Sequence, residues 1–208
     1  MVLGAVSWLQ EGGNGRSWST IALGIMWFLV SRLELRIVGS KELNLRVGDQ
    51  MPAMTVVKTD GTQITEQDLI ANAPALLTLY RGWWCPSSRA QVDELMERYE
   101  HLNKKGVSIY AASVDEPEAA APIQEHVGNS ITILCGVSAD VLRKIGVLDK
   151  RGAPWYDRII FGAPERPIAM PSTLVIDNDG TIRFASRSTR VDEGPRVDAI
   201  LASLSSLR

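Results

Sequence analysis

The sequence has few of the side chains from which disulfide frameworks, metal centres and nucleic-acid interfaces are built. Its 208 residues include two cysteines, Cys85 and Cys135, and two histidines, His101 and His126. Two cysteines cannot form a disulfide framework, and with two histidines they make a poor metal-binding set, so we expect no metal and no cofactor. A net charge of -2 provides no excess of basic residues, which argues against a nucleic-acid partner.

Long apolar runs are scarce as well. The N-terminal segment, residues 1–42, contains the one candidate, Trp18 to Val30, which at about 1.5 Å per residue covers roughly 20 Å of a hydrocarbon layer about 30 Å thick. Two alternatives stay open: a short membrane anchor that contacts lipid through residues 18–31, or a buried or interfacial helix. More cations follow the run than precede it, so an anchored chain would keep its main domain in the cytoplasm. We expect no cleavable signal peptide, because no Ala-x-Ala-like site follows the run.

Residues 43–208 have the length of one domain with a buried core. Within them, short apolar segments alternate with amphipathic ones. The pattern predicts strands at 75–80, 107–115 and 131–135, and helices at 86–104, 116–127 and 138–145. Such alternation predicts an α/β fold with parallel strands in a central sheet and helices on both faces.

Turn signals complete the expected order of elements. Asp60-Gly61, within an alternating stretch, predicts an early β-hairpin, and Asn178-Asp179-Gly180 predicts a second one near the end. Residues 150–169 hold several glycines and prolines and are expected to form a long loop. A final helix is expected from about Pro195.

Cys85 lies where the strand at 75–80 gives way to the helix at 86–104. A thiol at a helix N-terminus meets unpaired backbone N–H groups and the positive end of the helix dipole, and both favour the thiolate. Pro86 suits the first helical turn, where its missing N–H costs nothing. Cys85 is therefore the candidate nucleophile, although a free cysteine can also be no more than a small buried hydrophobic residue.

The string Tyr80 to Pro86, followed by Arg89-Ala90-Gln91, resembles the peroxiredoxin-like branch of the thioredoxin superfamily, the alkyl hydroperoxide reductase and thiol-specific antioxidant group. Leu43 to Pro52 resembles the opening segment of such domains. The resemblance implies a thioredoxin-like three-layer fold with a central mixed sheet and an N-terminal β-hairpin, preceded here by the hydrophobic helix. It also implies a thiol oxidoreductase that acts on a protein disulfide or a small hydroperoxide and is recycled by an external thiol.

The same resemblance assigns residues to substrate binding. Met170-Pro171, ahead of a strand, is similar to the cis-proline loop that faces the active cysteine in thioredoxin-like proteins. Trp84 and Pro86, beside Cys85, are expected to contact substrate together with this loop.

The sequence departs from the family at the supporting positions. Most relatives carry a second cysteine three residues after the first, where this chain has Ser88, and peroxiredoxins carry threonine where it has Gly82. We expect the Ser88 hydroxyl to donate a hydrogen bond to the Cys85 thiolate, but it cannot resolve a disulfide. Cys135 could resolve Cys85 only if their Cα atoms lie within roughly 7 Å; otherwise it is a buried strand residue.

Two arginines flank the cysteine and have two interpretations. Arg81 and Arg89 could each favour the thiolate by their charge, or they could be solvated side chains on a loop and a helix start. Three functions follow from these residues: a monothiol oxidoreductase with Cys85 as nucleophile, a one-cysteine hydroperoxide peroxidase, or a redox-inactive binding module that uses the Trp83-Trp84 surface.

Overall fold

The computed structural model describes residues 15–34, 43–187, 200 and 202, and the chain divides into two compact units, Met1–Ser40 and Lys41–Arg208. In the first unit, α2 (Gly15–Glu34) includes the apolar run found in the sequence. Most of its described large apolar side chains are exposed, Trp27 most of all, and Ile21 is half-buried. Among the helices of the described ranges, none combines the length and apolar content needed to cross a bilayer, in contrast to the membrane-spanning alternative.

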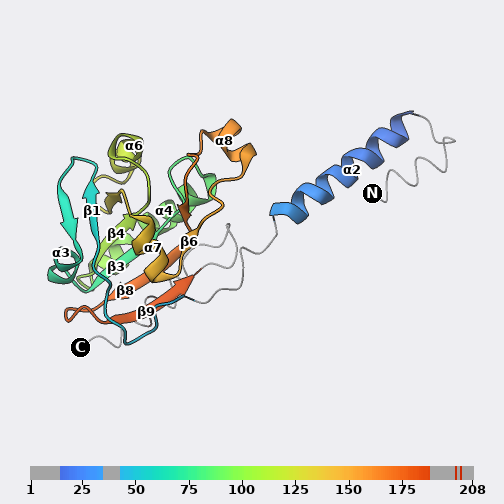
Figure 1. Ribbon diagram of the computed structural model, residues 1–208. Helices are drawn as coiled ribbons and strands as arrows, with labels where there is room; N and C mark the ends of the chain where they lie inside the picture. Colours follow the sequence, from blue (N-terminus) through green and yellow to red (C-terminus); the bar gives the residue numbers. More distant parts are fainter. Residues whose placement is uncertain (1–14, 35–42, 188–199, 201, 203–208) are drawn as a thin grey trace. The chain divides into compact units, whose positions relative to one another are not determined.

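The second unit is built on a seven-stranded mixed sheet in the order β2-β1-β5-β4-β3-β8-β9 (Figure 1). A separate two-stranded sheet pairs β6 with β7. The strands are β1 (Thr55–Lys58), β2 (Gln63–Thr65), β3 (Ala75–Leu79), β4 (Ser108–Ala112), β5 (Thr132–Cys135), β6 (Leu148–Asp149), β7 (Ile168–Ala169), β8 (Ser172–Ile176) and β9 (Ile182–Arg187).

The pairing confirms the topology expected from the sequence. Strands β3, β4 and β5 are parallel neighbours, and β8 joins β3 on the other side in the antiparallel sense. Both predicted hairpins are present, β1 with β2 around Asp60-Gly61 and β8 with β9 around Asn178-Asp179-Gly180. Every residue of β3 is buried, so both faces of the sheet are covered at its centre.

The helices of this unit are α3 (Glu66–Ala71), α4 (Pro86–Glu97), α5 (Tyr99–Asn103), α6 (Pro117–Val127), α7 (Ala139–Ile145) and α8 (Trp155–Phe161). Two expectations were wrong in detail. The helix predicted over 86–104 is divided at Arg98 into α4 and α5, and the loop predicted over 150–169 contains α8 and β7. Of the helix expected from Pro195, only Ile200 and Ala202 lie within the described residues.

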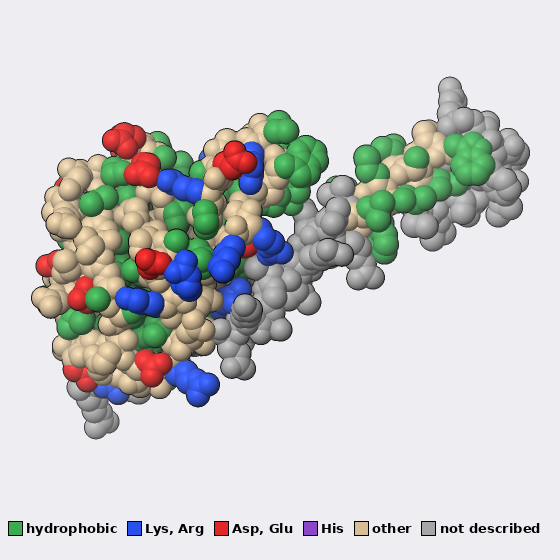
Figure 2. Space-filling model, viewed as in Figure 1, with side chains coloured by type: hydrophobic (Ala, Val, Ile, Leu, Met, Phe, Trp, Pro, Cys, Tyr) green, Lys and Arg blue, Asp and Glu red, His purple; other side chains and the backbone are tan. Residues whose placement is uncertain are grey.

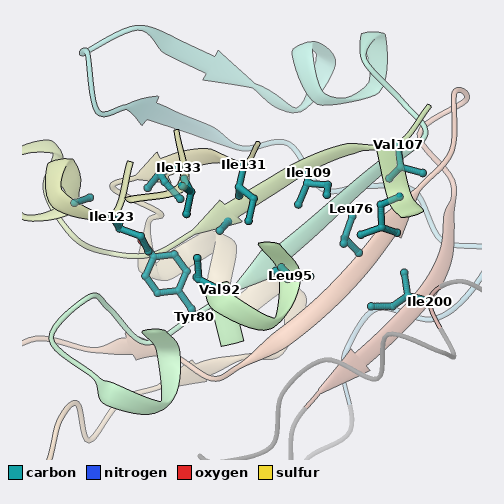
Figure 3. Close-up of a cluster of buried hydrophobic side chains, with 14 of the residues drawn as sticks. Leu76, Tyr80, Val92, Leu95, Val107, Ile109, Ile123, Ile131, Ile133 and Ile200 are labelled. Carbon is teal, nitrogen blue, oxygen red and sulfur yellow. The ribbon is translucent and has the colours of Figure 1, made fainter. Parts of the chain in front are cut away.

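One part of the core of the unit lies between the sheet and helices α4, α5 and α6. A cluster of buried apolar side chains comes from these helices and from β3, β4, β5 and β8, and Ile200 joins it (Figure 3). Val92 and Leu95 from α4 and Leu102 from α5 pack on this core, as their spacing in the sequence predicts. This packing fixes α4 against the end of β3, where Cys85 lies.

The outer face of α8 carries apolar side chains that are exposed and not buried. Four of its seven residues, Trp155, Ile159, Ile160 and Phe161, are large, apolar and exposed, and apolar side chains are visible over this helix in Figure 2. The same helix turns one polar residue, Asp157, inward, where it is buried.

Candidate active site

The predicted strand-to-helix junction is present, with Cys85 as the N-cap residue of α4. The Tyr80 N–H still donates to the Ala112 carbonyl and extends the β3–β4 ladder, after which the chain turns into the helix. The Cys85 carbonyl accepts from the N–H groups of Ser88 and Arg89, which closes the first turn. The thiol is free and only 3% exposed, so the sulfur lies at the buried end of α4.

Arg81 is the residue that contacts the sulfur. Its guanidinium Nη1 donates to Cys85 Sγ at 3.8 Å, and the residue is only 6% exposed. The guanidinium also lies over the Trp84 ring, 5.0 Å from the ring centroid, and its Nη2 is 3.6 Å from Asp157 Oδ2. A buried cation beside a sulfur stabilises the thiolate more than a solvated one, because low dielectric strengthens the interaction. The interpretation of Arg81 as a solvated side chain was therefore wrong.

Arg89 is exposed, and its side chain contacts Trp83 and not Cys85. Its Nε donates to the Trp83 carbonyl at 2.7 Å, and its guanidinium lies 4.7 Å from the centroid of the Trp83 ring. On the other side, the His126 ring is 6.0 Å from Trp83 and bonds Asp93 at 2.7 Å. Trp83 is thus held in place by α4 and α6.

Ser88 has a different partner from the one expected. Its buried hydroxyl oxygen accepts from the Arg81 backbone N–H at 3.3 Å. Among the hydrogen bonds of the described residues, the one that reaches the Cys85 sulfur comes from Arg81 and not from Ser88. Ser88 therefore holds the main chain of the residue that supplies the charge.

Gly82 fits a space that no larger residue can occupy. Its φ of +149° is one that L side chains rarely adopt, and an added Cβ would lie 2.3 Å from Trp84 Nε1 and 3.0 Å from Asp115 Oδ1. The threonine expected here from the family pattern would collide with both groups. The close approach of Trp84 explains the glycine.

Asp115 is a buried carboxylate that the sequence analysis missed. Its Oδ2 accepts from the Trp83 N–H at 3.0 Å, and burial raises its pKa above the ordinary value, partly opposed by that hydrogen bond. The signal in the sequence was its position after β4, because the carboxyl ends of parallel neighbours β3 and β4 meet at one edge of the sheet.

Comparison with known proteins identifies the family. Residues 47–185 match the AhpC/TSA family. The chain belongs to this family. A putative peroxiredoxin from Mycobacterium tuberculosis is 22% identical over 151 residues, which is 73% of this chain and 90% of the relative. The thiol-disulfide oxidoreductase ResA from Bacillus cereus is 21% identical over 144 residues, 69% of this chain and 70% of the relative.

Solved structures confirm the thioredoxin-like α/β fold of this AhpC/TSA protein. The peroxidoxin BcpB from Mycobacterium tuberculosis superposes with a TM-score of 0.64 at 19% identity, covering 79% of this chain and 99% of the other. A thiol peroxidase from Chromobacterium violaceum gives 0.63 at 18% identity, with 82% and 90% covered. The family is one of peroxiredoxin-like thiol oxidoreductases, and this chain shares its fold.

The Met170-Pro171 segment of the AhpC/TSA protein precedes β8, and its expected contact with substrate stays a prediction. Ser172 pairs with Leu79 at the end of β3, which brings Met170-Pro171 to the same edge of the sheet. The bond before Pro171 is not cis, however; the cis bond within the described residues joins Ala73 and Pro74. The Met170 N–H donates to the Val147 carbonyl and its own carbonyl accepts from the Ser172 hydroxyl, so both backbone groups already have partners within the fold.

Cys135 is the second free thiol and is completely buried, with its side chain in the core cluster. Burial, assisted by the charge of Asp115, raises its pKa to about 12. Cys135 is the last residue of β5. Because β4 lies between β5 and β3, strands β5 and β3 are about 10 Å apart. A role for Cys135 in resolving Cys85 stays a prediction, to which this placement adds no support.

Proposed function

We propose that this AhpC/TSA protein is a thiol-dependent oxidoreductase with Cys85 as its single redox cysteine. The observation that carries the proposal is the buried Arg81 guanidinium, 3.8 Å from the sulfur at the N-terminus of α4. A cation and a helix N-terminus at one thiol favour the thiolate, which is the reactive form. Trp84 and Pro86, which flank Cys85 in the chain, and Met170-Pro171, at the same edge of the sheet, are the proposed substrate contacts.

The oxidising substrate that suits this site best is a small hydroperoxide. Cys85, Trp84 and Arg81 are all buried, so a compact molecule reaches the sulfur with less rearrangement than a folded protein disulfide would need. The thiolate attacks the outer oxygen and the O–O bond breaks. The proton lost by the thiol ends on the leaving oxygen, so thiol and hydroperoxide give sulfenic acid and alcohol.

Recycling would require two external thiols. The first attacks the sulfenic acid and releases water, which leaves a mixed disulfide on Cys85. The second attacks the mixed disulfide, so that Cys85 returns as a thiol and the two external sulfurs leave as a disulfide. Ser88 cannot take the place of either thiol, and the high pKa of Cys135 keeps it protonated at neutral pH.

A disulfide substrate is the second candidate, favoured by the likeness to ResA. The same thiolate would attack one sulfur of the disulfide, forming a mixed disulfide with Cys85 and expelling the other sulfur as a thiolate. One external thiol would then attack the Cys85 sulfur and expel the bound half of the substrate as a thiol, and a second would free Cys85, so that the two external sulfurs leave as a disulfide. Both candidates share the first step, nucleophilic attack by Cys85.

The test is the consumption of hydrogen peroxide and of a model disulfide with dithiothreitol as reductant. We expect turnover by the unaltered chain, loss of turnover in Cys85→Ser, and full turnover in Cys135→Ser as the matched control. Turnover with only one oxidant would identify the substrate class. Slow alkylation of Cys85 at every pH, together with no consumption of either oxidant, would leave the redox-inactive binding module as the correct function.

A further inference from the structure

Arg81 is held at the sulfur by side chains from two distant parts of the chain. Nη1 faces Cys85 Sγ at 3.8 Å, and Nη2 faces Asp157 Oδ2 at 3.6 Å. The two amino groups of one planar guanidinium therefore bridge the thiol and the carboxylate. The guanidinium carbon also lies over the Trp84 ring, 5.0 Å from the ring centroid.

Asp157 is brought to this position by α8, the helix that replaces the expected loop. The Ala163 N–H donates to the Asp157 carbonyl at 3.2 Å, and the Arg158 Nε donates to the Ala153 carbonyl at 3.2 Å. A second ion pair, Arg158 with Glu165 at 2.6 Å, lies at the exposed side of the helix. These bonds fix α8 with Ile159 outside, 76% exposed, and Asp157 inside.

A buried guanidinium needs a partner of opposite charge. Removing one member of a buried ion pair leaves the other uncompensated, and a long arginine side chain then turns toward water. For Arg81 such a turn would withdraw Nη1 from Cys85. The carboxylate of Asp157 opposes it.

We propose that Asp157 is a positioning residue, which acts on Cys85 through Arg81. This inference deepens the proposed function and rests on it, because it takes Cys85 as the reacting thiol. Asp157 contributes no atom to the reaction; it keeps the guanidinium directed at the sulfur.

The sign of the effect separates this role from simple electrostatics. Asp157 is an anion, so if it acted on Cys85 directly by its charge, its removal would favour the thiolate and move the alkylation profile to lower pH. If it positions Arg81, its removal weakens the contact between the cation and the sulfur, and the profile moves to higher pH. Of the other charged groups at the loop, Asp115 holds the Trp83 N–H and Arg89 lies over the Trp83 ring, and neither is altered by the change.

The experiment measures the rate of iodoacetamide alkylation of Cys85 against pH, by mass spectrometry of its peptide. In Asp157→Ala we expect the pH of half-maximal rate to rise by about one unit. Arg81→Met should raise it at least as much, and the double variant should show no further rise, because the two residues act as one unit. Glu165→Gln, which breaks the other ion pair of α8, is the matched control and should leave the profile unchanged.

A lower pH of half-maximal rate in Asp157→Ala, or effects that add in the double variant, would overturn the proposal. Asp157→Asn, which preserves the shape of the side chain, and circular dichroism of each variant separate loss of fold from loss of position. Alkylation needs no substrate turnover, so the outcome is independent of the oxidant. If the unaltered chain consumed neither peroxide nor disulfide while Asp157→Ala still moved the profile upward, the proposed function would fail and the positioning role would stand.

Discussion

At the scale of single residues, the site places a buried cation, Arg81, and a buried carboxylate, Asp115, on the loops that follow the neighbouring strands β3 and β4. Arg81 faces the sulfur and pairs with Asp157, whereas Asp115 accepts from the Trp83 N–H, and this bond and the charge of Arg166 favour its ionised form. Burial outweighs these contacts and raises the pKa of Asp115 above its ordinary value of 3.8. Asp115 should weaken the fold when it is ionised.

The change Asp115→Asn tests this statement. A carboxyl group with a raised pKa in the folded state keeps its proton where the unfolded chain has lost it, so the free energy of unfolding falls as pH rises above about 3.8 and levels off above the folded pKa. The asparagine oxygen can still accept from the Trp83 N–H, but it carries no charge. We expect the two proteins to be equally stable at pH 4 and the variant to be more stable at pH 7, measured by urea unfolding. A difference that does not change with pH would contradict this account.

The sequence was sufficient to find Cys85 and insufficient to find its partners. Cys85 is marked by local features, an apolar strand before it and Pro86 after it. Arg81 is equally local, but its burial depends on α8, a helix far away in the sequence within a segment rich in glycine and proline. The need for glycine at position 82 likewise becomes clear only from the position of the Trp84 ring in the folded structure.

At the scale of elements, the geometry of α4 determines whether a side chain at position 88 can reach Cys85. Residues three apart on a helix lie one above the other, so a thiol at position 88 would face Cys85 at a Cα separation close to the roughly 5.5 Å that a disulfide prefers. The hydroxyl of Ser88 also accepts from the Arg81 N–H, a bond that a weaker sulfur acceptor replaces poorly.

We predict that Ser88→Cys forms a disulfide with Cys85 on mild oxidation. The expected results are the loss of two free thiols in a thiol assay and a gain of insulin-type disulfide reduction over the unaltered chain. Ser88→Ala is the control, since it removes the same acceptor without adding a thiol; it should lose stability by about 1 kcal/mol and gain no reductase activity. Three free thiols that persist after oxidation in the unfolded variant, Cys135 among them, would show that the first turn of α4 cannot close this bond.

The sequence predicted correctly the elements that depend on the periodicity of apolar residues and on turn-forming residues. The β1–β2 hairpin, the alternation from β3 to α7 and the β8–β9 hairpin all follow from local patterns of the sequence. The break at Arg98 and the short helix α8 do not follow from local patterns, because they depend on tertiary contacts. Asp157, at 9% exposure, is held by the fold rather than by any helical period.

At the scale of the whole molecule, the residues of the site converge from three places on one edge of the sheet. Arg81 and Cys85 follow β3, Asp115 follows the parallel neighbour β4, and Asp157 comes from α8. Each of them lies in the unit Lys41–Arg208. The chemistry of Cys85 should therefore depend on this unit alone.

We predict that a chain beginning at Lys41 keeps the reactivity of Cys85. The rate of alkylation at pH 7 and the consumption of peroxide should stay within about twofold of the full chain, because a compact unit with its own core folds independently. Arg81→Met should lower the alkylation rate by the same factor in the short and the full chain, which tests whether the site itself is intact. A folded short chain with slow alkylation, insensitive to Arg81→Met, would mean that residues 1–40 contribute to the environment of the sulfur.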